Sequence, residues 1–265
     1  MSVFDFSRHE KKKPKESIAL KKGLRILVAG ASGDIGVALL DLLSSNELKI
    51  GAHYYKNGEC LKTYQGREET HKVIQGDITT QEKAFKLVDE FLNWSGGIDG
   101  LVVLNGGISQ LVSWEHLAEA DWLSDIKMNL LGPFFLVQRA FSHMRAKGGK
   151  IVMVSTASAR HGASGMTMAY GVSKAGVESM VKGLAREGAD SNILVNAVSP
   201  GFIDSKVQTE KLKRTENDLQ HRASLTRMKR AGTVWEVAGV IAFLLSDYAN
   251  YITGEVISIN GGDWI

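Results

Sequence analysis

The chain has 265 residues, of which 44% are hydrophobic and 23% are charged, and these values predict one large α/β domain with a full core. No run of 18 or more apolar residues occurs, so we expect no transmembrane helix, and the N-terminus lacks the apolar stretch of a signal peptide. The single cysteine, Cys60, excludes an internal disulfide and favours a cytoplasmic location. No metal site is predicted.

The net charge of +3 is concentrated near the N-terminus. Residues 1–22 hold seven cations and three acids, a net charge of +4, so the remainder of the chain carries about −1. We interpret residues 1–22 as a solvated, partly disordered basic extension ahead of a domain at 23–265. Attraction to nucleic acid or to an anionic surface is the alternative, but no aromatic residue is interleaved with the lysine cluster, so we expect neither a nucleic-acid nor a membrane partner.

Short β-branched runs alternate with longer segments of helical period along the chain. The strands are predicted at 25–29, 48–53, 72–75, 100–104, 150–154, 193–198 and 255–259. The helices are predicted at 34–45, 80–94, 119–146, 167–188 and 234–246. This alternation predicts an α/β single-domain Rossmann fold, in which a doubly wound, seven-stranded parallel sheet has helices on both faces. Residues 204–232 are polar, basic and poorly patterned, which suggests a mobile segment before the last helix and strand.

A glycine-rich turn follows the first predicted strand and opens a helix. It contains Gly30, Ser32, Gly33, Asp34, Ile35 and Gly36. Glycines at this spacing permit a tight turn and let backbone amides approach a pyrophosphate, whose charge a helix N-terminus favours. The turn is therefore a candidate dinucleotide site.

The second predicted strand ends in Tyr54, and no carboxylate follows at once to accept the ribose hydroxyls of NAD. Lys56 has the charge to pair with a 2′-phosphate, so NADP(H) is favoured over NAD(H). The alternative is that Lys56 points to water.

Two further stretches follow strands and suit the same cofactor. Asp77 and Ile78 provide a carboxylate and an apolar side chain for an adenine ring. Asn105 and Gly106 come after the fourth strand, where small residues let a cofactor pass close to the backbone.

Tyr170 and Lys174 are four residues apart in a predicted helix, so the phenol and the ammonium group share one face. A free tyrosine has a pKa of about 10, and a neighbouring cation is expected to lower it. The pair suits acid/base chemistry on a carbonyl group.

Together with Ser199-Pro200-Gly201-Phe202-Ile203, Asn129-Leu130-Leu131-Gly132 and Tyr251-Ile252-Thr253-Gly254, these motifs give the chain a resemblance to the short-chain dehydrogenase/reductase family over residues 20–265. The C-terminal pattern looks most like the 3-oxoacyl-carrier-protein reductases, although many sugar and alcohol dehydrogenases share it. The glycine turn departs from the common pattern, since Asp34 stands where a glycine is usual and Ala29 where a threonine is usual.

The resemblance implies a role for each matching residue. Tyr170 would be the proton donor, Lys174 would bind the nicotinamide ribose and lower the pKa of Tyr170, and Asn129 would anchor a water chain. Pro200, Gly201 and Ile203 would contact the cofactor.

The hydroxyl that orients the substrate is displaced by one residue relative to the family pattern. Counting from the fifth strand selects Thr156, and counting back from Tyr170 selects Ser158; Ser155, or no hydroxyl partner, is the third alternative.

The leading hypothesis is an NADPH-dependent carbonyl reductase that acts on a ketone, with a 3-oxoacyl thioester carried by coenzyme A or a carrier protein as one candidate substrate. The alternatives are an NAD(P)-dependent dehydrogenase of a small secondary alcohol, sugar or sterol, and a nucleotide-binding regulator with weak catalysis. The resemblance also implies a homotetramer, formed through the helices that carry Asn129 and Tyr170.

Overall fold

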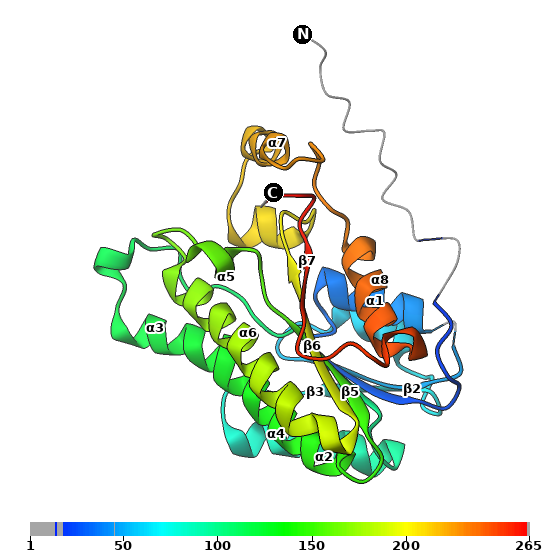
Figure 1. Cartoon of the computed structure of the whole chain (residues 1–265). Coiled ribbons are helices and arrows are strands. Elements are labelled where there is room, and N and C mark those ends of the chain that lie inside the picture. The colour runs from blue at the N-terminus through cyan, green and yellow to red at the C-terminus, as the bar shows by residue number, and fades with distance from the viewer. Residues whose placement is uncertain (1–13, 15–17, 45, 264–265) are drawn as a thin grey trace.

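The computed structural model describes residues 14, 18–44 and 46–263. Seven parallel strands form one sheet in the order β3-β2-β1-β4-β5-β6-β7 (Figure 1). The strands are β1 (Arg25–Ala29), β2 (Lys49–Tyr54), β3 (His71–Gln75), β4 (Gly100–Val103), β5 (Gly149–Val154), β6 (Ile193–Pro200) and β7 (Val256–Ile259). The strand order reverses between β1 and β4, so the predicted doubly wound Rossmann fold is confirmed.

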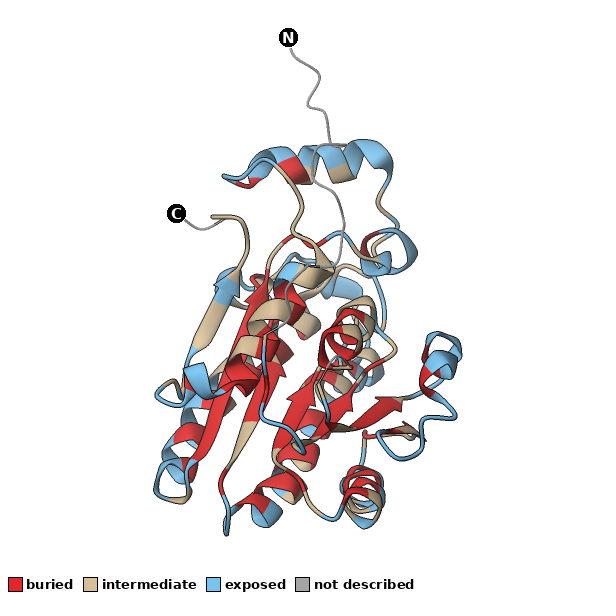
Figure 2. Cartoon of the chain, turned by 90° about the vertical axis from the view of Figure 1, so that its right-hand side faces the viewer, coloured by how far each residue is buried: buried red, intermediate tan, exposed pale blue. Residues whose placement is uncertain are grey.

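Helices cover both faces of this sheet. They are α1 (Asp34–Leu43), α2 (Gln81–Ser95), α3 (Glu119–Ile126), α4 (Gly132–Met144), α5 (Ser158–His161), α6 (Met168–Gly188), α7 (Glu216–Leu225) and α8 (Val234–Leu245). Ile26 and Val28 of β1 belong to the core beneath α1 and α8, whereas Leu27 and Ala29 belong to the core beneath α2, α4 and α6. Successive residues of a strand point to opposite faces, which is why β1 is apolar from Ile26 to Ala29. Figure 2 shows the central strands of the sheet buried between helices whose outer faces are exposed.

The single long helix predicted at 119–146 is divided. α3 leads into a π-helical turn, η4 (Lys127–Leu131), and α4 follows it. Hydrophobic periodicity could not reveal this turn, because a π turn shifts the register by one residue without breaking the helical pattern.

Residues 204–232 contain more regular structure than their sequence pattern suggested. The π-helical turn η6 (Val207–Lys211) is followed by α7, whose N-cap Thr215 forms a capping box with Asp218. Thr215 Oγ1 accepts from the amide of Asp218, and the Asp218 carboxylate accepts from the amide of Thr215. This local signal was present in the sequence, although the helix lacks a continuous apolar face.

The boundary between extension and domain falls earlier than residue 23. Residues 1–13 and 15–17 of the predicted basic extension lie outside the described residues, as do Trp264 and Ile265. Leu20 is 7% exposed, its amide donates to Asn46 Oδ1, and Lys22 pairs with Glu47. Within 14, 18–44 and 46–263, none of the helices has the length and apolar character needed to cross a bilayer.

Candidate functional site

The predicted site residues lie in loops that follow the carboxyl ends of the parallel strands. Gly30 follows β1 with a φ of +81°, and a side chain there would meet the backbone nitrogen of Asn105 at 2.9 Å. A side chain at Gly36 would lie 2.5 Å from the carbonyl oxygen of Ala31. The turn can therefore close only with glycine at both positions, and it brings the loops after β1 and β4 into contact.

His53, which the sequence analysis did not select, supports this turn. Its ring is fully buried at the end of β2; Nδ1 accepts from the amide of Gly30 at 3.2 Å, and Nε2 lies 3.0 Å from the carbonyl oxygen of Gly76. Burial lowers the pKa of His53. The neutral ring therefore accepts on one nitrogen and donates on the other, which links the loops after β1 and β3.

The α1 N-terminus begins at Gly33 without a side-chain cap. The Asp34 carboxylate instead accepts from the backbone amide of Lys206 at 2.6 Å. This bond directs the carboxylate toward the 204–232 segment and leaves the first amides of the helix to an anion. Ser32, Gly33 and Ile35 are not buried, so the turn retains the accessibility that a pyrophosphate requires.

At the end of β2, Lys56 is exposed, and its ammonium group lies 5.2 Å from the centre of the Tyr55 ring. Tyr54 is half-buried against Gly58. The nearest following acid, Glu59, pairs with Lys62 at 2.8 Å. Within the described part of the chain, Lys56 thus remains a cation that no carboxylate pairs with.

The side chains of Asp77 and Ile78, which we expected to contact an adenine ring, already make contacts within the protein. The Asp77 carboxylate accepts from the amide and hydroxyl of Thr79 and from Lys83 Nζ at 2.8 Å. Ile78 is 5% exposed, and a side chain at Gly132 would lie 2.8 Å from its carbonyl oxygen. The prediction that the Ile78 side chain faces an adenine ring is therefore not met, because that side chain packs in the core.

Three predicted residues converge after β4. The missing side chain of Gly106 would lie 2.7 Å from Asn129 Oδ1 and 2.9 Å from Lys174 Nζ. Asn105, next to Gly106, has a buried Oδ1 that lacks a hydrogen-bond partner within the described residues. The unpaired Asn105 Oδ1, the uncapped N-terminus of α1 and the glycine turn at Gly30 lie near one another. These groups fit a dinucleotide that has both hydrogen-bond donors and phosphates, and they are the groups that would hold it.

Asn129 is fully buried in the π-helical turn η4. Its Oδ1 accepts from the amide of Gly107 and its Nδ2 donates to the carbonyl of Gly107, each at 2.9 Å. Nδ2 also donates to the carbonyl of Asp125. The side chain thus connects the loop after β4 to the helical turn, which is a structural role in addition to any role in proton supply.

Lys174 is 2% exposed, and its ammonium group donates to the carbonyls of Asn105 at 3.1 Å and Val154 at 2.8 Å. Burial lowers the pKa of Lys174 to about 8. The group is still mainly cationic at pH 7. A lysine ammonium has three donors, so one N–H remains for a further acceptor beyond these two bonds.

Tyr170 is half-buried in α6, and Thr156 lies within hydrogen-bonding reach of its phenol. Burial raises the pKa of Tyr170, the Thr156 hydroxyl opposes that rise, and the charge of Asp125 adds to it. The net shift of the Tyr170 pKa is thus upward, opposite to the lowering expected from Lys174, and burial is its largest cause. The phenol is therefore protonated at neutral pH.

The three hydroxyl candidates differ in what they contact. Thr156 Oγ1 accepts from the amide of Ser158 at 3.3 Å and faces Tyr170. Ser155 Oγ donates to Glu178 at 2.7 Å and lies 3.3 Å from the carbonyl of Lys174, so it links β5 to α6. Ser158 begins α5. The geometry favours Thr156.

Asp125 is a buried carboxylate that the sequence analysis missed. It is 3% exposed in α3, and its Oδ1 accepts from the amide of Ser109 at 2.8 Å. Burial raises the pKa of Asp125. The only signal in the sequence was its position, four residues before Asn129 on the same helical face.

The end of β6 and the loop after it also lie at the carboxyl edge of the sheet and are bonded to the loop after β5 and to β7. The amide of Ala157 donates to the carbonyl of Pro200 at 2.8 Å, and the amide of Gly201 donates to the carbonyl of Ile259 at 2.9 Å. Ile203 is 4% exposed and pairs with Gly232. Among the residues described, no group of three or more His, Cys, Asp or Glu side chains has an arrangement that would hold a metal ion.

A family model described as "Enoyl-(Acyl carrier protein) reductase" matches residues 30–263. The chain is 39% identical over 245 residues to a 3-oxoacyl-[acyl-carrier-protein] reductase from Thermotoga maritima, with 91% of this chain and 98% of the relative covered. It is 35% identical over 241 residues to an acetoacetyl-CoA reductase from Synechocystis, with 89% and 94% covered. The chain belongs to the short-chain dehydrogenase/reductase family.

The fold of this chain is similar to that of a solved structure over nearly its whole length. A short-chain dehydrogenase/reductase from Brucella melitensis, described as a glucose/ribitol dehydrogenase, has a TM-score of 0.84 and 32% identity, covering 94% of this chain and all of that one. As a short-chain dehydrogenase/reductase, this protein is an oxidoreductase that acts on CH–OH or C=O groups.

The charge of Asp125 predicts a pH effect in this short-chain dehydrogenase/reductase. Because a carboxylate raises the pKa of Tyr170, Asp125→Asn should lower it while keeping an acceptor for Ser109. The family resemblance implies that Tyr170 is the proton donor. Carbonyl reduction would then need the protonated phenol, so its kcat/KM should decline at a lower pH in the variant than in the wild type. Alcohol oxidation needs the phenolate and should rise at a lower pH.

Steady-state rates across the alkaline range would measure this shift. Glu119→Gln, which removes an exposed acid from the same helix, is the matched control and should leave the profile in place. Superimposable profiles for Asp125→Asn and the wild type would contradict the assignment.

Proposed function

We propose that this protein is an NADPH-dependent carbonyl reductase that transfers hydride to the ketone of a 3-oxoacyl thioester, with Tyr170 as general acid. The observation that carries the proposal is the convergence of Asn129 Oδ1 and Lys174 Nζ at Gly106, together with a phenol on the helix of Lys174 that Thr156 can reach. A proton donor, Tyr170, and the glycine-lined loops that would bind the cofactor thus lie at the same edge of the sheet.

The reaction needs an acid because hydride addition to a ketone produces an alkoxide. NADPH supplies the hydride when it is bound. Tyr170 transfers its phenolic proton to the carbonyl oxygen, and the raised pKa keeps that proton in place until negative charge develops. Thr156 donates a hydrogen bond to the same oxygen and fixes its position.

Lys174 and Asn129 support this proton transfer. Lys174 keeps a positive charge at the loop after β4, where it donates to the carbonyls of Asn105 and Val154, and its remaining N–H would donate to a ribose hydroxyl of the cofactor. The charge also stabilises the phenolate that forms when Tyr170 gives up its proton. Asn129 holds the Gly107 backbone and provides the helical turn at which water returns a proton to the site.

Two observations support a thioester substrate. The relatives described above are named for reduction of 3-oxoacyl-carrier-protein and acetoacetyl-CoA substrates. Residues 206–230 also carry eight cations and three acids, which suits a substrate that bears phosphate. The similarity to the Brucella melitensis glucose/ribitol dehydrogenase structure supports a second candidate, oxidation of a polyol or another small secondary alcohol.

The proposed preference for NADP(H) rests on the end of β2. Lys56 is exposed there, and no acid lies between Tyr54 and Gly58 to accept ribose hydroxyls. A 2′-phosphate carries negative charge that a lysine attracts and a carboxylate would repel.

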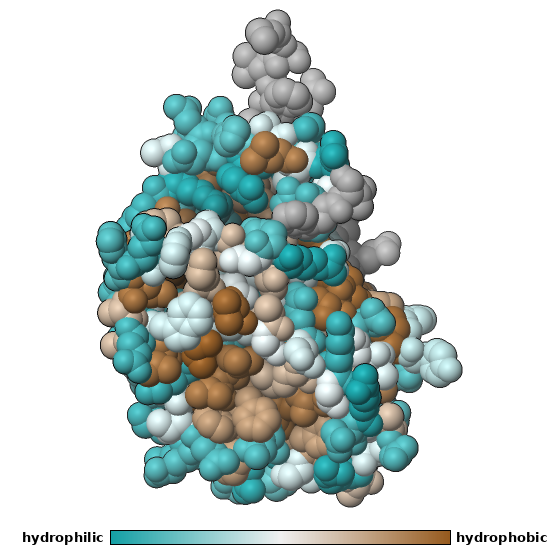
Figure 3. All heavy atoms as spheres, turned by 60° about the vertical axis from the view of Figure 1, so that its left-hand side comes forward, coloured by the Kyte–Doolittle hydropathy of each residue, from teal (hydrophilic) through white to brown (hydrophobic). Residues whose placement is uncertain are grey.

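We also propose a homotetramer. Leu123, Leu131 and Val172 are 42%, 37% and 44% exposed in α3, η4 and α6. Figure 3 shows apolar side chains gathering on the face formed by these helices. Covering such a patch stabilises an assembly, so light scattering should give a particle of about four times the 28.9 kDa chain mass. A monomer across the working concentration range would contradict this proposal.

Tyr170→Phe removes the acid while retaining the ring, so NADPH-dependent reduction of acetoacetyl-CoA should fall by about 10²-fold or more. Thr156→Ala should lower kcat by a smaller factor, and Ser158→Ala is its matched control, with kcat close to the wild type. Spectrophotometric assays of the three variants measure these effects.

A panel with 3-oxoacyl thioesters, enoyl thioesters and small alcohols would separate the candidate reactions. Turnover of alcohols alone would favour the dehydrogenase, and reduction of a C=C bond alone would contradict carbonyl reduction. A Ser158→Ala variant that loses all turnover would overturn the assignment of Thr156.

Cofactor choice is tested by comparing KM for NADPH and NADH in the wild type and Lys56→Ala. Loss of the cation should raise KM for NADPH by about tenfold and leave KM for NADH unchanged, because only NADPH has the 2′-phosphate. Lys62→Ala, which removes a cation paired with Glu59, serves as control. Equal KM values for the two cofactors in the wild type would contradict the preference.

A further inference from the structure

Two arginines of the 204–232 segment flank one aromatic ring. The guanidinium carbons of Arg214 and Arg222 each lie 6.0 Å from the centre of the Phe202 ring. Phe202 is 6% exposed and follows Gly201 at the end of β6. The ring therefore fixes two cations from different parts of the segment close to the carboxyl edge of the sheet.

The partners of these arginines do not neutralise them. Arg214 donates to the neutral Gln208 side chain. Arg222 has one loose ion pair, with Asp263 at 3.6 Å, and its buried Nε lacks a hydrogen-bond partner within the described residues. Neither guanidinium group is therefore closely paired: Asp263 is distant from Arg222, and Asp218 acts on Arg214 through its charge without an ion pair among the described contacts. A buried donor is also unsatisfied.

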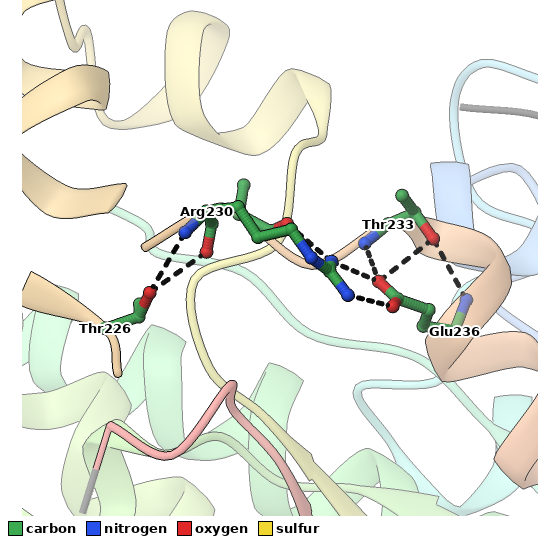
Figure 4. A network of polar contacts seen from close by, with 5 residues as sticks. Thr226, Arg230, Thr233 and Glu236 are labelled. Atoms are coloured by element: carbon green, nitrogen blue, oxygen red, sulfur yellow. Dashed lines mark hydrogen bonds and ion pairs between the residues drawn. The ribbon is translucent and has the colours of Figure 1, made fainter. Parts of the chain in front are cut away.

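Arg230 of the same segment, in contrast, forms a bidentate ion pair with a carboxylate. Its two terminal nitrogens bind both oxygens of Glu236, at 2.9 and 2.6 Å, and Figure 4 shows this network with Thr226 and Thr233. The Arg230 charge, with burial opposing it, lowers the pKa of Glu236 to about 2. Arg214 and Arg222 have no such bidentate partner among the contacts described.

The acids nearest to the two arginines have other roles. Asp218 accepts from the amide and hydroxyl of Thr215 in the capping box of α7. Glu216 accepts from Gln220. Burial lowers the pKa of Arg214 and the Arg222 charge lowers it further, while the Asp218 charge opposes this, so the two cations lie within electrostatic reach of one another. An anion between them would relieve this repulsion.

Arg214 and Arg222 lie near the candidate functional site at the carboxyl edge of the sheet. The segment is bound at its start by the bond from Lys206 to Asp34, and near its end by the amide of Met228, which donates to the carbonyl of Gly261 at 3.0 Å. The arginines lie between these attachments, against residues that follow β6 and β7, and Figure 1 shows α7 above that edge of the sheet.

We propose that Arg214 and Arg222 form an oxyanion site that binds a phosphate group on the carrier arm of the thioester substrate. Two guanidinium forks present planar donor sets that match phosphate oxygens, and Asp263 holds Arg222 until the phosphate arrives. The inference rests on the proposed reduction of a 3-oxoacyl thioester. Coenzyme A and a carrier protein both provide such a phosphate, through the 4′-phosphopantetheine group that they share.

Steady-state kinetics with three acetoacetyl thioesters test the site: those of coenzyme A, of phosphopantetheine and of N-acetylcysteamine, which has no phosphate. Arg222→Gln and Arg214→Gln should raise KM for the coenzyme A thioester by about tenfold or more, with little change in kcat. KM for the N-acetylcysteamine thioester and for NADPH should not change. Lys211→Gln, the same loss of charge at an exposed position of the segment, is the matched control.

The phosphopantetheine thioester identifies which phosphate is bound. An equal loss with it and with the coenzyme A thioester assigns the pantetheine phosphate and supports the proposal, whereas a loss confined to coenzyme A would assign a nucleotide phosphate outside the carrier arm and would overturn it. Equal losses on all three substrates would mean a purely structural role, and a raised KM for NADPH would assign the arginines to the cofactor. Both results would overturn the inference, as would unchanged kinetics.

Binding of free coenzyme A, measured by calorimetry, tests the site without turnover. Arg222→Gln should weaken binding, whereas Asp263→Asn should strengthen it, because Asp263 competes for the same guanidinium. Binding does not require turnover, so these opposite effects of the two variants would be seen even if the protein reduced no thioester. Failure of the proposed function can therefore be distinguished from failure of the proposed phosphate site. Absence of coenzyme A binding to the wild type, or changes of the same sign in both variants, would overturn the proposal.

Discussion

The site depends on the absence of a side chain at Gly106. The Lys174 ammonium and the Asn129 amide both lie within 2.9 Å of the position that a β-carbon would occupy. Any larger residue would displace one of these groups, since the backbone on the other side is held by the bonds of Asn129 to Gly107. The helix that carries the lysine and the one that carries the asparagine are therefore set against the loop after β4 by one close approach.

Burial decides the electrostatics at this edge. Desolvation lowers the pKa of Lys174 and raises that of Tyr170, so the phenol remains protonated and the ammonium group is mainly charged near pH 7. Asp125 and the hydroxyl of Thr156 act on the tyrosine in opposite senses, since the carboxylate raises its pKa and the hydroxyl lowers it. The acid strength of the phenol is consequently a balance between groups from three separate elements.

Local patterns predicted much of the molecule because they reflect local physics. Alternation of apolar runs with helical periods gave the seven strands within one or two residues, and the glycine spacing gave the turn after β1. Helical spacing selected Tyr170 and Lys174, the resemblance added Asn129, and the structure brings these residues to one edge of the sheet. The π-helical turn at Asn129 and the capping box of α7 were not recognised, since neither changes the apolar pattern of its segment.

The sequence by itself determined the Rossmann fold, the order of its elements and the glycine turn, because each depends on residues close together in the chain. Only the tertiary structure decided that Thr156 rather than Ser155 faces the tyrosine, and that His53 supports Gly30. It also decided that Arg214 and Arg222 share the Phe202 ring, and that Asp34 turns to Lys206, 172 positions away. Such contacts join elements that are distant in sequence, and their burial and charge exist only once the sheet has gathered the loops at one edge.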